Sequence, residues 1–284
     1  MEPITFNSYA DENIYSNHSK RICRYESEYV YHSHELFELI FFLEGDMTYA
    51  VDGKEYKLNK NDIVFTRPFD IHCLKSDSEN LYERYNILFD KSIMPFDLYE
   101  KIHPDVDVIS MEGNRNVQNL FDKIDYYSSV LPVDELRPML SNLISEICIN
   151  IIHEAKPPSE RIYTNAIVSQ AINYIDEHLT TLSGIEEICN ELYITKSHLH
   201  HLFIKHLKIS PKKYVITKRL ARAQRELCTG AKPTEVYTKC GFSDYSAFYR
   251  AYKSRFGCTP SEKTEAGKAV ITNDKTPIQY AFKH

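Results

Sequence analysis

The sequence predicts a two-domain protein: an N-terminal antiparallel β-barrel followed by helices, and an all-α C-terminal domain with two helix-turn-helix units. Three observations lead to this fold class. Short apolar segments alternate with turn residues over residues 29–90. After Gly113 the apolar residues recur at the spacing of a helix. Residues 196–255 contain fourteen Lys and Arg and three acidic residues, a net charge of +11 in a chain of net charge −6.

The segments in residues 29–90 are typical of strands. Residues 39–43 form a short apolar run. Asp52-Gly53 favours a two-residue hairpin, because both turn positions need a positive φ. Several strands at this spacing predict an antiparallel barrel. The aromatic side chains that we expect inside it are Phe37, Phe41, Tyr49 and Phe65.

Three histidines and a glutamate fall where strands could bring them together. Residues i and i+2 on a strand share a face, so His32 and His34 can both point inward. Glu38 is separated from His32 and His34 by an even number of residues, so on a strand it would share their face. His72 follows the turn at Pro68. Such side chains could hold a divalent metal ion, contact the hydroxyl or carboxylate groups of a ligand, or serve only the structure of the barrel. The residues leave these three interpretations open.

Residues 20–90 resemble the cupin fold, in which H-x-H, a glutamate and a later histidine hold a metal ion. The matching positions are His32, His34, Glu38 and His72. The resemblance implies a jelly-roll barrel that senses a small-molecule effector. It also implies that these four residues contact the effector, or ligate a divalent metal if one is bound. No other cofactor is predicted.

A helix is predicted over residues 136–152, because its apolar residues follow one helical face. They are Leu136, Leu140, Leu143, Ile144, Ile147 and Ile151. This face must pack on the barrel or on a second subunit, and we expect it to form a homodimer. Pro157-Pro158-Ser159 is interpreted as a linker.

Two similar helical units follow. In the first, a helix over 185–192 leads through a turn to a helix that Thr195 caps. In the second, a helix over 234–239 leads to a helix that Ser243 or Asp244 caps. Pro211 begins the long helix between them, since proline is favourable at the first helical position.

The second helix of such a unit lies in the major groove of DNA, and nearby Lys and Arg contact phosphates. Residues 185–203, 211–230 and 241–260 resemble the double helix-turn-helix domain of the AraC/XylS regulators. The resemblance implies that early residues of both helices read bases. The predicted DNA-binding residues on these helices and the connecting helix are Lys196, Ser197, His200, His201, Lys205, Arg219, Tyr245, Ser246, Tyr249, Arg250 and Lys253.

Three positions depart from the family's pattern. Cys189 and Tyr237 occupy positions where the family usually has a small alanine. Because tyrosine is large for a tight helix crossing, we expect the second unit to be repacked. His201 stands where arginine is common, and histidine is a weaker partner for phosphate or guanine near neutral pH.

These patterns predict a barrel over 1–110, a helical dimerisation segment and linker over 111–158, a DNA-binding domain over 159–262, and a tail over 263–284 without an assigned role. The chain lacks an apolar stretch of about 18 residues and an N-terminal signal pattern, so a cytoplasmic protein without a membrane partner is expected.

The predicted function is sequence-specific regulation of transcription in response to a small-molecule effector such as a sugar or related metabolite. Double-stranded DNA, the effector and a second copy of the chain are the expected partners, with RNA polymerase added if the protein activates transcription. No catalytic residue is predicted. One alternative is a metal-dependent cupin enzyme with a helical appendage. Another is a constitutive DNA-binding protein whose barrel only dimerises.

Overall fold

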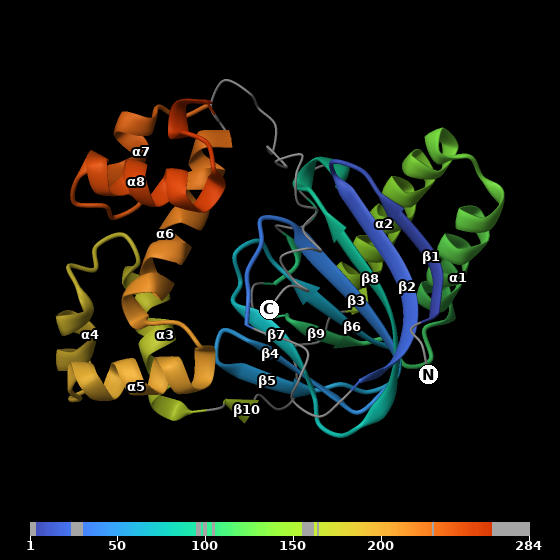
Figure 1. Ribbon diagram of the computed structural model, residues 1–284, viewed down its shortest axis with the longest axis horizontal. Helices are drawn as coiled ribbons and strands as arrows, with labels where there is room; N and C mark the ends of the chain where they lie inside the picture. Colours follow the sequence, from blue (N-terminus) through green and yellow to red (C-terminus); the bar gives the residue numbers. More distant parts are fainter. Residues whose placement is uncertain are drawn as a thin grey trace. The chain divides into compact units, whose positions relative to one another are not determined.

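A computed structural model describes residues 4–23, 31–94, 98, 101–103, 106–154, 162–163, 165–228 and 230–262. The chain divides into two compact units with a boundary near residue 162. Figure 1 shows the strands and helices α1 and α2 in the first unit and the remaining helices in the second. The predicted linker at 157–159 and the tail at 263–284 lie outside the described residues.

The first unit contains two antiparallel sheets. One has the strand order β1-β2-β8-β3-β6-β9 and the other the order β10-β5-β4-β7. The strands are β1 (Ile4–Ala10), β2 (Ile14–Cys23), β3 (Phe37–Glu44), β4 (Met47–Val51), β5 (Lys54–Lys57), β6 (Asp62–Thr66), β7 (His72–Ser76), β8 (Asn80–Phe89), β9 (Val108–Ser110) and β10 (Ile162–Tyr163). A short 3₁₀ helix, η1 (Lys91–Ile93), follows β8.

The hairpin between β4 and β5 has the predicted turn. Asp52 and Gly53 both adopt positive φ values, 42° and 77°. These values suit the right-handed twist of the two strands, which is why Asp-Gly favours this connection. The prediction of a hairpin at Asp52-Gly53 is therefore confirmed.

Strands β1 and β2 were not expected, because the predicted strands began only at residue 29. The two strands pair with each other, and β2 pairs along its length with β8. A side-chain turn joins them, in which Asp11 Oδ1 accepts from the backbone N–H groups of Asn13 and Ile14, both at 2.7 Å. An aspartate turn of this kind carries no glycine or proline signal. Strand β1 is also largely exposed, so it shows little apolar alternation.

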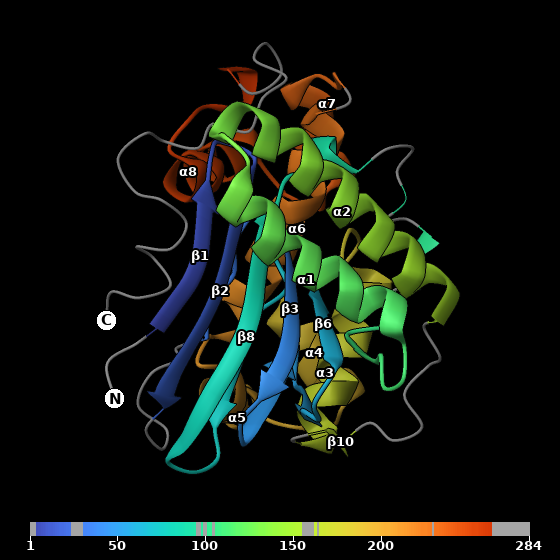
Figure 2. The same cartoon turned by 90° about the vertical axis from the view of Figure 1, so that its right-hand side faces the viewer.

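Helices α1 (Arg115–Val130) and α2 (Val133–Glu154) cover one face of the six-stranded sheet (Figure 2). Phe37, Phe41 and Phe65 face these helices, and the ring of Phe41 stacks on Phe121 of α1 with centroids 4.3 Å apart. The expectation that these three phenylalanines line the barrel interior was wrong. Strand β3 is apolar on both faces, so its sequence does not reveal which face is inside. Tyr49 belongs to the separate cluster between the two sheets, as expected.

The six apolar residues predicted on α2 are all buried in the same core as the sheet. The helix therefore packs on its own barrel, and the assignment of this face to a dimer interface is corrected. An amphipathic pattern shows that a face is covered without showing what covers it.

The second unit consists of α3 (Ala166–His178), α4 (Ile185–Glu191), α5 (Lys196–Leu207), α6 (Pro211–Cys228), α7 (Pro233–Lys239) and α8 (Tyr245–Phe256). Leu199, Leu202 and Phe203 lie on one face of α5 and are buried. Phe248, Tyr252 and Phe256 of α8 are also buried. No helix within the described part of the chain has both the length and the apolar character needed to cross a membrane.

Candidate DNA-reading helices and a histidine cluster

The first helix-turn-helix unit is α4, a tight turn and α5. The turn is closed by bonds from Tyr193 N–H to Asn190 O and from Ile194 N–H to Cys189 O. Thr195 is the N-cap of α5, and its side chain accepts from His198 N–H, as predicted. A satisfied cap fixes where α5 begins and thus which side chains lie on its first turn.

The second unit, α7 and α8, has the same turn bonds, from Gly241 N–H to Thr238 O and from Phe242 N–H to Tyr237 O. Of the two predicted caps, Asp244 is the one used, and its Oδ1 accepts from Ala247 N–H at 2.7 Å. Tyr237 is partly buried, and its ring meets the ring of Tyr245 edge-on instead of pushing the helices apart. The large residue is thus accommodated beside the helix crossing.

Most predicted reading residues are exposed. On α5 and α8 these are Lys196, Ser197, His200, His201, Lys205, Ser246, Arg250 and Lys253. Tyr245 and Tyr249 are partly buried and contact one another, with ring centroids 6.3 Å apart. Lys196 forms an ion pair with Glu186 of α4. Such an exposed pair contributes little stability and could be exchanged for a phosphate.

Arg219 of α6, one of the predicted DNA-binding residues, has structural partners within the second unit. Its guanidinium donates to the backbone carbonyls of Leu179, at 2.9 Å, and Leu182, at 2.6 Å. Burial lowers the pKa of Arg219. A Cβ on Gly241 would lie only 2.8 Å from Arg219 Nε and 2.9 Å from Leu179 O. Arg219 thus joins the end of α3 to the turn of the second unit, and its contact with DNA stays a prediction.

The predicted histidines of the barrel converge. His32 and His72 exchange two backbone hydrogen bonds of 3.0 Å, so they are directly opposite each other. One ring nitrogen from each of His32, His34 and His72 lies within 4.8 Å of the others. Glu38 Oε2 lies 3.1 Å from His72 Nε2 and 3.4 Å from His34 Nε2. The structure therefore brings together all four side chains predicted for this site.

The hydrogen bonds around this cluster orient the imidazole rings. His34 Nδ1 lies 2.9 Å from Leu36 O, and His72 Nδ1 lies 2.8 Å from Asp70 O. Because a carbonyl can only accept, each Nδ1 carries a proton and each Nε2 faces the cluster, where it donates when protonated and accepts or ligates when not. Histidines that ligate metals are usually oriented in this way. The donor set therefore fits a divalent metal ion, and equally fits hydroxyl donors of an organic ligand.

Electrostatics within the cluster favour the charged forms of Glu38 and His72. Burial opposes ionisation of Glu38, but its contacts with His34 and His72 outweigh burial and hold its pKa well below the usual value. Burial by itself would lower the pKa of His72. The neighbouring Glu38 carboxylate outweighs burial, so the pKa of His72 is raised. The contact between the two side chains thus offsets the effect of burial on each pKa.

Further polar side chains lie on the interior face of the barrel. Asn86 and Arg84 of β8 are paired with Ile40 and Phe42 of β3, so they share a face with Glu38. Both are buried, and Asn86 Oδ1 has no hydrogen-bond partner among the described residues. No pattern in the sequence indicated Asn86, because only the strand register reveals its face. A ligand inside the barrel would find hydrogen-bonding groups here as well.

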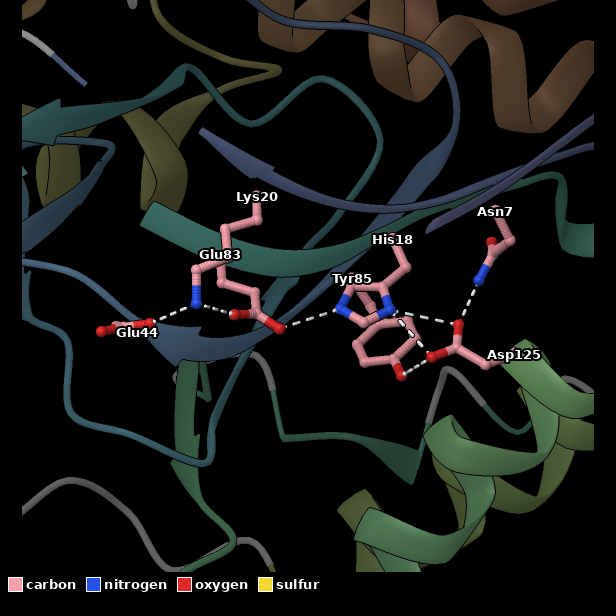
Figure 3. Close-up of polar contacts among 7 residues, drawn as sticks. All are labelled: Asn7, His18, Lys20, Glu44, Glu83, Tyr85 and Asp125. Atoms are coloured by element: carbon pink, nitrogen blue, oxygen red, sulfur yellow. Dashed lines mark hydrogen bonds and ion pairs between the residues drawn. The ribbon is translucent and has the colours of Figure 1, made fainter. Parts of the chain in front are cut away.

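A second charged cluster joins the outer face of the sheet to α1 (Figure 3). His18 Nδ1 lies 2.9 Å from Asp125 Oδ2, and its Nε2 lies 3.3 Å from Glu83 Oε1. Tyr85 donates to Asp125 at 2.7 Å, and Lys20 pairs with Glu83 at 2.7 Å. Burial would raise the pKa of Glu83, but bonds from Lys20 and His18 lower it. The cluster ties α1 to the sheet, and the sequence analysis did not identify it.

Comparison with known proteins gives two family matches. Residues 21–172 match the AraC-like ligand binding domain, and residues 188–266 match a helix-turn-helix domain. The chain is 30% identical over 137 residues to the Msm operon regulatory protein of Streptococcus mutans, covering 48% of this chain and 47% of that protein. It is 22% identical over 227 residues to the lactose operon transcription activator of Staphylococcus xylosus, covering 77% and 80%.

Among solved structures, the chain is similar to ToxT from Vibrio cholerae O395, with 15% identity, a TM-score of 0.38 and coverage of 90% of this chain and 98% of that one.

The chain spans about half the length of the Msm operon regulatory protein. The ligand-binding-domain match alone covers more than half of the chain, and the helix-turn-helix match begins at residue 188, after a gap over residues 173–187. On this evidence the chain belongs to the AraC family of transcriptional regulators.

Proposed function

We propose that this protein regulates transcription by binding double-stranded DNA sequence-specifically through α5 and α8, in response to a small molecule held in its barrel. The observation that carries the proposal is the pair of capped helices whose outer faces carry exposed polar and cationic side chains. The net charge of +11 over 196–255 supports a polyanionic partner. The family comprises regulators and not enzymes, which overturns the alternative of a metal-dependent cupin enzyme.

The effector would be a small polyol, such as a sugar, contacted by His32, His34, Glu38 and His72. A buried carboxylate accepts hydrogen bonds from hydroxyl groups, and an imidazole Nε2 lone pair does the same. Asn86 would add a further partner from β8. The resemblance to a regulator of a lactose operon supports a sugar-like effector.

A divalent metal ion held by the same four residues is the second candidate for this site. It is favoured by the two Nδ1–H groups fixed on backbone carbonyls, which present His34 Nε2 and His72 Nε2 to a common point. Metal content of the purified full chain, measured by mass spectrometry, separates the two. One equivalent of metal that disappears in Glu38→Gln supports this candidate, and a metal-free protein that binds a sugar overturns it.

A homodimer and a contact with RNA polymerase also belong to this proposal. Since the inner face of α2 is already covered, a dimer would use other apolar side chains on the helical pair. Tyr126, Val130 and Val133 are 61%, 52% and 71% exposed. Contact with RNA polymerase would follow if the protein activates transcription, as the lactose operon relative does. Sedimentation of the full chain and of Val133→Glu would test the dimer.

Selection of bound fragments from random DNA at two salt concentrations tests DNA recognition. We expect a recurring site with two half-elements about one helical turn apart, and affinity that falls steeply with salt. Arg250→Ala should relax the sequence preference in one half-element. Binding without a recurring sequence would contradict the proposal. Effector binding is tested by thermal shift with a panel of sugars on Glu38→Gln, with Glu79→Gln, at an exposed position, as the control.

A further inference from the structure

The first five residues of α8 present aromatic rings at positions where α5 presents polar groups. Counted from the N-caps Thr195 and Asp244, Tyr245 is equivalent to Lys196 and Tyr249 to His200. Residues 245–249 contain no lysine or arginine. Tyr245 and Tyr249 form adjacent, partly buried rings with centroids 6.3 Å apart. The second unit therefore starts its reading helix with an apolar surface edged by hydroxyl groups.

The ring of Tyr245 is held from more than one side. Tyr237 of α7 meets it edge-on, with ring centroids 5.7 Å apart and an interplanar angle of 80°. Phe248, which is fully buried, contacts it at 5.9 Å. The backbone of Tyr237 is itself fixed, because its carbonyl accepts from Phe242 N–H at 2.9 Å. A ring held in this way loses little side-chain entropy when it docks against a partner.

The position of Tyr245 determines what it could recognise. Residues at the start of a recognition helix reach the base edges in the major groove. The apolar feature of that groove is the C5-methyl group of thymine, which is recognised by apolar side chains. An aromatic ring already fixed at the start of α8 matches this group better than it matches a purine edge.

We propose that Tyr245 recognises a thymine methyl group, and that Tyr237 is a specificity-determining residue that acts by holding Tyr245 in place. The assignment rests on the proposed DNA binding. The assignment adds to the proposed DNA binding a difference in chemistry between the two units. Helix α5 reads bases through polar and cationic groups, whereas α8 reads them partly through contact with a methyl group.

The test replaces each thymine of the selected site, one at a time, with deoxyuridine, which removes only the methyl group. We expect one or two positions in the half-element assigned to α8 to lose about 3- to 5-fold in affinity for the full chain, the effect of exposing one methyl group. Footprints of Arg250→Ala identify this half-element. The half-element read by α5 should be insensitive at every position.

Variants then separate recognition from folding. Tyr237→Ala should keep sequence-specific binding but bring the thymine-to-uracil affinity ratio close to one. Tyr237→Phe retains the ring and should retain the ratio. Tyr193→Ala, which removes the exposed tyrosine at the turn of the first unit, is the matched control and should leave the ratio unchanged.

If thermal unfolding shows that Tyr237→Ala does not fold, the same ratio is measured for Tyr245→Ala and Tyr245→Phe. Loss of the ratio in the first and its retention in the second support the methyl contact. A site that is bound specifically but ignores every methyl group overturns this inference alone. The absence of any specific site overturns the proposed function as well.

Discussion

The two helix-turn-helix units share their turn hydrogen bonds but differ in the residue at the left-handed position of the turn. In the first unit this residue is Tyr193, with a φ of 53° and a side chain that is 95% exposed. In the second unit it is Gly241, with a φ of 84°. A Cβ on Gly241 would meet two backbone carbonyl oxygens of the α3–α4 connection at 2.9 Å. The same backbone conformation therefore tolerates a large side chain in one unit and excludes even a methyl group in the other.

This comparison shows that the sequence of a turn depends on the turn's neighbours as well as on its φ value. The first unit points its turn to solvent, and the second packs its turn against Arg219 and the end of α3. The reading faces differ as well, since α5 begins with Lys196 where α8 begins with Tyr245. Four substitutions test these differences, from the largest expected effect to the smallest.

Gly241→Ala should have the largest effect, a loss of about 4 kcal/mol in the free energy of unfolding of the C-terminal unit, because left-handed strain adds to a steric clash. Chemical denaturation measures it. Gly230→Ala is the matched control, since its φ is 88° but nothing lies within 4 Å of its Cβ position. Equal losses in the two variants would show that the close approach at Gly241 does not matter.

Arg219→Ala should cost about 2–3 kcal/mol in unfolding free energy, because it removes charge-assisted bonds to the carbonyls of Leu179 and Leu182. Arg222→Ala, one turn further along α6 and exposed, should leave stability unchanged. Thermal unfolding and the dependence of DNA affinity on salt should be recorded for both. Stability loss in the Arg222 variant, or none in the Arg219 variant, would contradict the distinction.

Arg250→Ala should weaken specific DNA binding by about 1–2 kcal/mol, and His201→Ala at the equivalent position of α5 should weaken it less. An arginine forms two parallel bonds to guanine or phosphate, whereas an imidazole forms one. Fluorescence anisotropy with the selected site gives both values. His201→Arg should strengthen binding, and a larger loss in His201→Ala than in Arg250→Ala would reverse the proposed ranking of the units.

Tyr193→Gly should change the unfolding free energy by less than about 1 kcal/mol, because relief of left-handed strain offsets the greater entropy of the unfolded chain. The exposed ring contributes little packing in the isolated protein. Denaturation curves of the two proteins should nearly coincide. A clear destabilisation would show that Tyr193 makes contacts that its exposure does not indicate.

Local patterns were sufficient to predict the helical unit in most respects. Caps at Thr195 and Asp244, a proline at the start of α6 and apolar residues at helical spacing each depend on residues close in sequence. For the same reason the Asp52-Gly53 hairpin could be predicted. The barrel histidines were also identified, although residues 33–36 form no strand, so the folded chain brings His34 to Glu38 by a bend and not by strand parity.

Tertiary contacts decided the rest. Whether Phe41 faces α1 or the barrel interior depends on strand register, which is set by pairing over long sequence distances. The covering of α2 by its own barrel, the use of Arg219 as a clamp and the contact of Tyr237 with Tyr245 also join residues that are remote or on different helices. The sequence by itself determined which residues prefer a helix, a turn or a buried face, because these preferences are local. The partner of each buried face was decided only by the folded structure, since an apolar or charged side chain specifies the chemistry of its neighbour but not its identity.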